Sequence, residues 1–317
     1  MKFHHIIYVV TILLLTGCTH KDLVFDHEST AHVRVIFDWE DAPDANPRSM
    51  TLYMYSSLGG DPLRYTFDNK NGGYIYLPYG TYDALALNGD IYEWAAERNL
   101  YDASSLEVLT PDMKGHTTYA PLPAEYLEHL LGKDAGERVI LPPGLLYTGR
   151  TDGFSVSVAD GDKTIILRPR EATCHYTIDI INVENISVLG GATLNGTLSQ
   201  MAESYFAGAF HAGEKDVAIP CYFVADAEKN TLHSEFLTFG HTPSVRRNNN
   251  LRLYLPLKDN SVRCYDYDVT SQAHDAPDPH HVHIVIDGLS LPHTIDTGGG
   301  IIPDVNQWES VIIPIPM

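Results

Sequence analysis

Several signatures of catalysis and metal binding are missing from the 317-residue sequence. It contains no G-x-S-x-G segment to supply a hydrolase nucleophile and no H-E-x-x-H segment to hold a catalytic zinc ion. Its four cysteines include no C-x-x-C pair, which excludes a zinc knuckle. Alternating strand and helix patterns are also absent, so a doubly wound nucleotide-binding fold is not expected. We therefore predict no catalytic, cofactor-binding or metal-binding residues and do not expect an enzyme.

Basic residues are scarce relative to acidic ones. Lys and Arg total 21 against 41 for Asp and Glu, which gives a formal net charge of −20. A surface of that charge repels phosphate backbones, so nucleic acid is excluded as a partner. Long hydrophobic runs are scarce as well, because the longest one near the N-terminus, Ile6–Leu15, has only ten residues. A helix of that length is too short to span a bilayer core of about 30 Å.

The same short run has the layout of an export signal. Lys2 precedes it, and small residues follow it up to Cys18. The Leu-Thr-Gly-Cys ending resembles a bacterial lipobox, which predicts a lipoprotein signal peptide over 1–17 and lipid attachment, such as palmitate, at Cys18. An ordinary export signal with a chance cysteine is the alternative. Several acyl chains on one residue hold a protein firmly to a membrane, and the polar residues 18–30 then form a tether.

Strand patterns dominate the rest of the chain. The sequence holds 19 Tyr, 24 Gly and 19 Pro, a composition that favours strands joined by turns. Within 32–39, Val33, Val35 and Phe37 alternate with polar residues, which predicts a strand with one buried face. Further strands are predicted at 50–56, 63–67, 73–78, 81–88, 153–159, 163–168, 176–180, 217–224, 235–239, 251–257, 261–269, 281–286 and 310–315.

Helical spacing is found at one place only, the segment 124–131, which we interpret as a short helix. Many short strands separated by turns are typical of antiparallel sandwiches. We therefore predict an all-β protein with two antiparallel β-sandwich domains in tandem, one over 31–165 that contains the short helix and one over 166–317. Glycines at Gly191 and Gly196 have the spacing of a phosphate loop but lack its Lys, so a turn is predicted there.

Five segments carry a resemblance to a known family. HVRVIFDWEDAPDANPRSMTLYMY (32–55) and LRYTFDNKNGGYIYLPYGTYDALALN (63–88) resemble a domain of unknown function found in lipoproteins of Gram-negative anaerobes. RPREATCHYTIDIINVENI (168–186), LRLYLPLKDNSVRCYDYDVTSQ (251–272) and WESVIIPIP (308–316) resemble the second domain of fimbrillin-type proteins. The resemblance covers most of the chain and consists of strands and turns, so it indicates fold more directly than activity.

The resemblance implies two transthyretin-like domains in a fimbrial lipoprotein at the outer membrane, exposed at the cell surface. Its implied partners are fimbrial subunits, joined by adding a strand to a neighbour's open sheet edge. Lys21 is the only basic residue in the tether, unlike a stalk subunit trimmed by a protease, and this favours an anchor or accessory role. The segment 308–316 is our preferred assembly strand, with a plain closing strand as the alternative.

Two clusters provide other hypotheses. The segment from His274 to His283 also contains Asp278, His280 and His281, and these residue types bind zinc. A metal site there would suit a secreted hydrolase, while a solvated loop is the simpler interpretation. Six tyrosines could form a platform for a glycan or host protein, as in a surface adhesin, or could be ordinary cross-strand packing: Tyr53, Tyr55, Tyr74, Tyr76, Tyr79 and Tyr82.

The remaining cysteines, Cys174, Cys221 and Cys264, allow two interpretations. They are either buried apolar residues, or one disulfide and one free thiol. Their wide spacing does not decide between the two.

Overall fold

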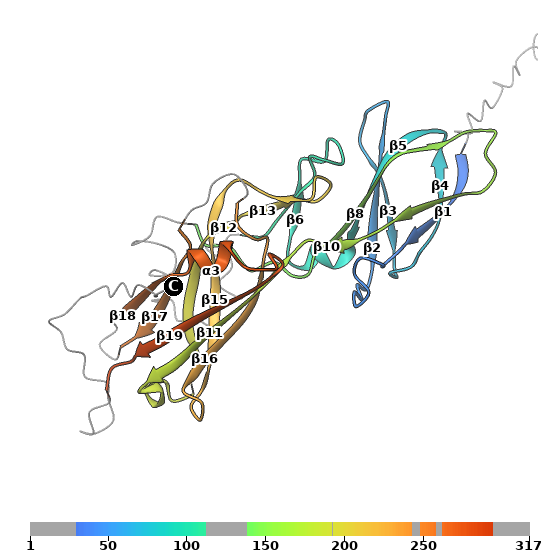
Figure 1. The fold of residues 1–317 in the computed structure, drawn as a ribbon. Helices are drawn as coiled ribbons and strands as arrows, with labels where there is room; N and C mark the ends of the chain where they lie inside the picture. The colour runs from blue at the N-terminus through green and yellow to red at the C-terminus, as the bar shows by residue number, and fades with distance from the viewer. Residues whose placement is uncertain (1–29, 112–137, 192, 243–247, 258–261, 294–317) are drawn as a thin grey trace, which may run out of the picture.

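Strands make up almost all of the regular structure. The computed structural model describes residues 30–111, 138–191, 193–242, 248–257 and 262–293. Within these ranges it contains nineteen strands, two 3₁₀ helices and one α-helix of five residues. Figure 1 shows an elongated molecule with the blue and cyan N-terminal strands at one end and the orange and red strands at the other. The predicted strand-dominated class is confirmed.

Two sheets pack face to face around the first core. The three-stranded sheet has the order β4 (Gly72–Pro78), β1 (Thr30–Phe37), β9 (Lys163–Leu167), and the five-stranded sheet has the order β10 (Arg170–Glu171), β8 (Tyr147–Val156), β5 (Gly80–Asn88), β2 (Met50–Ser56), β3 (Leu63–Phe67). Val33, Val35 and Phe37 of β1 are buried in this core, as their alternation predicted. Leu52 and Met54 of β2 belong to the same cluster.

A small sheet joins the two ends of the molecule. Its strands are β14 (His211–Ala212), β13 (Ser204–Phe206), β7 (Glu107–Leu109) and β6 (Ala96–Arg98), and η1 (Gly89–Glu93) lies between β5 and β6. Its central pair places Tyr205 opposite Val108, and both belong to a buried cluster that also contains Leu85. Strands from both predicted domains therefore share this sheet and this core. The division into 31–165 and 166–317 stays a prediction.

The second large core lies inside a curled seven-stranded sheet. Its order is β18 (Val262–Asp268), β17 (Asn250–Pro256), β12 (Leu194–Ala202), β15 (Asp216–Asp226), β16 (Thr231–Thr238), β11 (Cys174–Glu184), β19 (His281–Ser290), with η3 (Ile186–Leu189) and α3 (Thr270–His274) in its connections. The curl brings its two end strands together, because Tyr265 Oη of β18 donates a hydrogen bond to Ser290 O of β19 at 3.2 Å. The sheet is therefore a half-barrel whose open side lies between β18 and β19.

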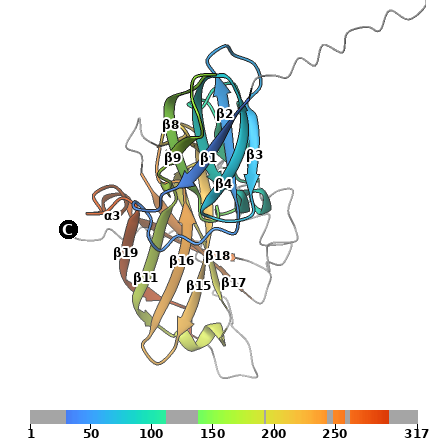
Figure 2. The same cartoon turned by 90° about the vertical axis from the view of Figure 1, so that its right-hand side faces the viewer.

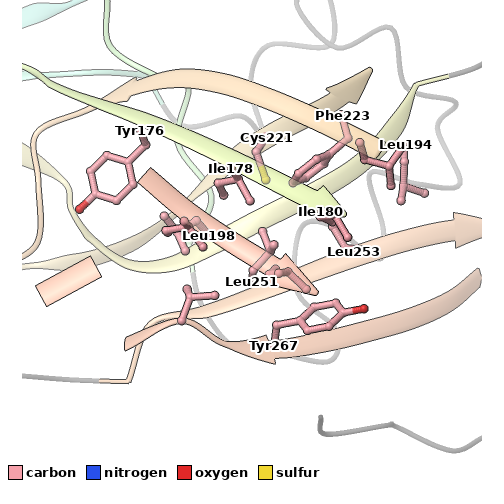
Figure 3. Packing of buried hydrophobic residues seen from close by; sticks show 14 of the residues in the cluster. Tyr176, Ile178, Ile180, Leu194, Leu198, Cys221, Phe223, Leu251, Leu253 and Tyr267 are labelled. Carbon is pink, nitrogen blue, oxygen red and sulfur yellow. The ribbon is translucent and has the colours of Figure 1, made fainter. Parts of the chain in front are cut away.

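The packing inside this half-barrel follows the alternation of the sequence. Tyr176, Ile178 and Ile180 of β11 are almost completely buried and point into the core, as Figure 3 shows. Leu251 and Leu253 of β17 are also fully buried in the same cluster, as predicted from their common face. Because successive side chains of a strand point to opposite faces, local alternation predicted which residues of β11 enter the core.

Two strand pairs are parallel, which the predicted antiparallel sandwiches did not include. β1 runs parallel to β9, with Val33 opposite Lys163, and β11 runs parallel to β19, with His175 opposite His281. In each pair the partners are more than a hundred residues apart in sequence, which provides the long connection that parallel pairing needs. Inward and outward side chains alternate with a period of two residues in both parallel and antiparallel strands. The sequence pattern therefore could not show that these two pairs are parallel.

Two elements differ from the expectation. Gly196, predicted as the end of a turn, lies inside β12, where an added Cβ would meet Arg252 O of the neighbouring strand at 2.9 Å. Glycine is needed there because two backbones lie close together. Helix α3 was not predicted, since five residues show no helical period. The predicted helix at 124–131 and strand at 310–315 lie outside the described residues.

Truncating a residue at the centre of the half-barrel tests the assignment of this core. Ile180→Ala should lower the free energy of unfolding by about 2–5 kcal/mol, because it removes fully buried methyl groups and leaves a cavity. The matched control is Val158→Ala, at a turn position that is 79% exposed. This control should change the free energy of unfolding by less than about 0.5 kcal/mol. Equal losses in urea denaturation would contradict the assignment.

Candidate functional site

The outer edge of β19 is covered by a side chain instead of a strand. β19 pairs with β11 on one side only and ends the seven-stranded sheet. On its other side, Val285 N donates to Gln272 Oε1 at 2.8 Å, and Gln272 Nε2 donates to Val285 O at 3.0 Å. One glutamine amide therefore satisfies both main-chain groups that a neighbouring strand would otherwise bind. Gln272 lies on α3, which packs against β19.

Two tyrosines satisfy other main-chain groups of β19. Tyr265 Oη donates to Ser290 O at 3.2 Å, and Tyr267 Oη donates to Gly288 O at 3.4 Å. Tyr265 and Tyr267 thus bridge the gap between strands β18 and β19. We call this gap the β18–β19 seam. Side-chain bonds of this kind contribute only about 0.5–1.5 kcal/mol each, so main-chain pairing with an added strand can replace them. The seam is therefore the place where this sheet is chemically ready to accept a strand.

Of the six predicted tyrosines, three are buried, two are exposed, and Tyr79 is half-buried and packs against the first core. Tyr53, Tyr55 and Tyr82 are buried, and the Tyr53 hydroxyl lies 2.8 Å from that of Tyr92. Burial, together with a hydrogen bond to Glu97, strongly raises the pKa of Tyr53. These side chains are cross-strand and core packing, and a continuous six-tyrosine platform does not exist.

Two tyrosines of the set do face solvent. Tyr74 and Tyr76 of β4 are 59% and 69% exposed. His32 of β1 lies opposite Tyr76 in the register of the sheet, with its ring tilted relative to Tyr76 at a centroid distance of 5.3 Å and parallel to that of Tyr74 at 4.6 Å. Arg34, the next outward residue of β1, is exposed beside Tyr74. We call these four residues the outer aromatic face.

The predicted histidine cluster is dispersed by the fold. His281 and His283 point to the same face of β19, and His281 Nδ1 lies 2.8 Å from Asp278 Oδ2. His283 Nε2 instead lies 2.7 Å from Asp179 Oδ2 of β11, whose other oxygen lies 2.7 Å from His233 Nδ1 of β16. Sequence reasoning missed Asp179 and His233 because they join the cluster only through strand pairing.

Other members of the cluster have different neighbours. The His274 ring lies 4.2 Å from the ring of His241, and His280 Nδ1 lies 3.3 Å from Thr173 O. The ring of His175 stacks on His281 at 5.1 Å. Across the part of the chain that the structure describes, no three His, Cys, Asp or Glu side chains are placed to hold a metal ion. The metal hypothesis for 274–283 therefore has no geometric support.

The Asp179 carboxylate is the electrostatic centre of this histidine face. Partial burial tends to raise its pKa, but hydrogen bonds from His233 and His283 outweigh this and hold the pKa below its usual 3.8. The hydrogen bond to Asp179 in turn raises the pKa of His233 above 6.5, against the opposing effect of burial and with the help of a hydrogen bond to Glu235. The pair is therefore ionised together under mildly acidic conditions.

The three cysteines form no disulfide within the described residues. Cys174 and Cys221 are buried, and burial raises the pKa of Cys174 to about 12. Of the two interpretations, the buried apolar role fits these two residues.

Two predicted functional segments lie outside the described residues: Cys18 and 308–316. Lipid attachment and the assembly strand therefore remain predictions. The described part of the chain contains no helix long and apolar enough to cross a membrane.

Comparisons place the chain among known proteins. The family described as "Domain of unknown function (DUF5119)" matches residues 17–221, while no curated protein matches the chain. A candidate adhesin from Bacteroides ovatus has a similar structure, with a TM-score of 0.62 at 17% identity over 88% of this chain and 99% of its own. The fimbrial anchor protein Mfa2 from Porphyromonas gingivalis gives a TM-score of 0.49 at 12% identity over 81% of this chain and 90% of its own. The first likeness shows a shared fold.

The ion pairs at Asp179 predict a pH-dependent contribution to stability. The lowered pKa of Asp179 stabilises the fold above its unfolded value of 3.8, and this is lost as the pH falls through the folded pKa. The raised pKa of His233 stabilises the fold at pH values below its unfolded pKa of 6.5, and this stabilisation is lost as the pH rises through the folded pKa. Asp179→Asn should therefore lower the free energy of unfolding more at about pH 5 than at about pH 8. The difference between the two losses should be about 1 kcal/mol or less, because the pair is exposed to solvent. Equal losses at both pH values in denaturant titrations would refute this coupling.

Proposed function

The chain belongs to the DUF5119 family, and we propose that it is a lipid-anchored cell-surface protein that contributes to anchoring or assembling a fimbria through strand-mediated subunit contacts. The resemblance of its strand and turn segments to fimbrillin-type proteins supports this role, and the similar Bacteroides ovatus structure supports the fold. In this proposal, the lipid on Cys18 holds the chain at the outer membrane and residues 18–30 act as a tether. The chain then works by contact, with transthyretin-like sandwich domains over 31–165 and 166–317.

The β19 edge is the observation that carries the proposal. Gln272 holds the N–H and C=O of Val285 with a single side chain, so displacing it costs two hydrogen bonds. An added strand along β19 would restore both bonds and add others on either side of Val285. A strand from a fimbrial subunit would therefore bind with a net gain in main-chain pairing. The outward residues of β19 alternate with buried ones, so side chains of a partner can also contact the exposed face of this strand.

A role as a surface adhesin is the second candidate. The exposed rings of Tyr74 and Tyr76 favour it, because large aromatic rings left in water on one sheet face are typical of ligand-binding surfaces. Its ligand would be a glycan or a host protein. This surface lies at the end of the molecule opposite the β18–β19 seam, so the two roles are separable by mutation (Figure 1).

Removing the predicted assembly strand tests the first role. Deletion of Trp308–Met317 should abolish co-purification of fimbrial subunits from intact, crosslinked cells, while the first sandwich stays folded by circular dichroism. The companion variant Cys18→Ala should keep the subunit contacts but release the protein from the membrane fraction. Retained co-purification after the deletion would count against strand 308–316, and membrane retention of Cys18→Ala would count against the lipid.

Uncovering the β19 edge tests the seam itself. Gln272→Ala should lower the free energy of unfolding by about 1–2 kcal/mol, because it leaves both main-chain groups of Val285 without that partner. It should also increase self-association in sedimentation velocity, since a bare edge pairs with other strands. Ser271→Ala on the same short helix is the control, because its side chain is exposed and it should behave as the parent protein. A monodisperse Gln272→Ala protein would show that this amide does not protect the edge.

A further inference from the structure

The outer face of the three-stranded sheet is a flat surface built from side chains alone. β1 pairs with β4 on one side and with β9 on the other, so its main chain has no free edge. Figure 2 shows these three strands side by side at one end of the molecule. Register places His32 opposite Tyr76 and Arg34 between Tyr74 and Thr164. A ligand that lies across this face is recognised by rings and charges, because the central strand β1 has no free edge and only the outer strands β4 and β9 have one.

The rings of this face are held in place before any ligand arrives. His32 stacks on Tyr74 with an angle of 4° between the ring planes and also contacts Tyr76. The backbone under Tyr76 is fixed too, because Tyr65 Oη donates to Tyr76 O at 2.8 Å. Rings that are already ordered lose little conformational freedom on binding, which favours affinity. Such rings offer flat apolar surfaces of the size of a sugar ring, whose C–H groups pack against aromatic faces.

Arg34 adds a positive charge that forms no ion pair and no aromatic contact with the residues that the structure describes. Among the arginines that the structure describes, six others pair with carboxylates and three lie over aromatic rings. Arg34 alone has neither kind of contact, although acidic residues outnumber basic ones about twofold. The Asp162 carboxylate lies 3.5 Å from His32 Nδ1 and is paired with that ring, not with Arg34. A guanidinium group left open in such an acidic protein is suited to a ligand carboxylate, which it can bind with two parallel hydrogen bonds.

We infer that the outer aromatic face binds a carboxylated sugar, with pyranose rings stacked on Tyr74 and Tyr76 and the sugar carboxylate paired with Arg34. Asp162 and the tyrosine hydroxyls are placed to bind sugar hydroxyls. A protein partner is disfavoured, because a stable protein interface needs roughly 20–30 residues a side and this face offers few. The inference gives the adhesin role a ligand class and is independent of the strand contact at β19.

Binding of defined oligosaccharides to the purified full-length chain tests this site. Calorimetry with tetragalacturonate and with sialyllactose distinguishes the two sources of a sugar carboxylate, and the methyl ester of tetragalacturonate is the neutral control. At least one acid should bind, and esterification should weaken the binding of tetragalacturonate about tenfold if it is the ligand. Arg34→Gln should weaken binding of the acid about tenfold and leave weak binding of neutral sugar unchanged. Tyr74→Ala and Tyr76→Ala should each abolish binding of both.

Tyr101→Ala is the matched control, because that ring is 82% exposed at a turn outside this face, and it should bind as the parent protein does. Thermal unfolding of each variant checks that the fold is intact. Failure of both acids to bind, or equal affinity for acid and ester, would overturn the inference. Fimbrial co-purification should be unchanged in Tyr74→Ala. Loss of a protein partner in Tyr74→Ala without any sugar binding would show a protein contact instead.

Discussion

Main-chain hydrogen bonding across strands is the constraint on which this structure depends. Every strand in a sheet needs a partner on each side, and strands at an edge leave N–H and C=O groups open. The curl of the seven-stranded sheet brings its two edges together without joining them, and side chains cover part of the gap. The two hydrogen bonds between Gln272 and Val285 are the clearest case. Unpaired main-chain N–H and C=O groups at a sheet edge can cause aggregation. The same groups can also bind a strand donated by another subunit.

The sheets also show how one alternating pattern can serve two purposes. On β1, Val33 and Val35 fill the core, while His32 and Arg34 on the opposite face reach solvent. On β19, Ile284 is fully buried while His283 joins an ionic group with Asp179 of the next strand. Because the inward residues provide the stability, the outward residues are free to change for recognition. This division separates the two candidate contact surfaces from the packing that supports them.

Much of the architecture was predictable from local pattern. The bounds of β2 and β3 agree with the predicted strands 50–56 and 63–67, since alternation and turn residues are local signals. The candidate site was predicted less well. The separation of Tyr53 from Tyr74 could not be foreseen, because both occupy strands of similar pattern and only one of those strand faces is covered by other parts of the chain. The role of Gln272 was missed because its partner is 13 residues away across an edge.

The amino-acid sequence by itself determined the strand-dominated class, the inward faces of alternating strands such as β1 and β11, and the acidic character of the surface. These follow from side-chain alternation and from composition, which act over a few residues or over the whole chain. Tertiary structure alone decided the two parallel pairs, the positions of the open edges, and which tyrosines and histidines meet. Those features depend on contacts between residues far apart in sequence, such as Asp179 with His283, and no local pattern records which distant strands become neighbours.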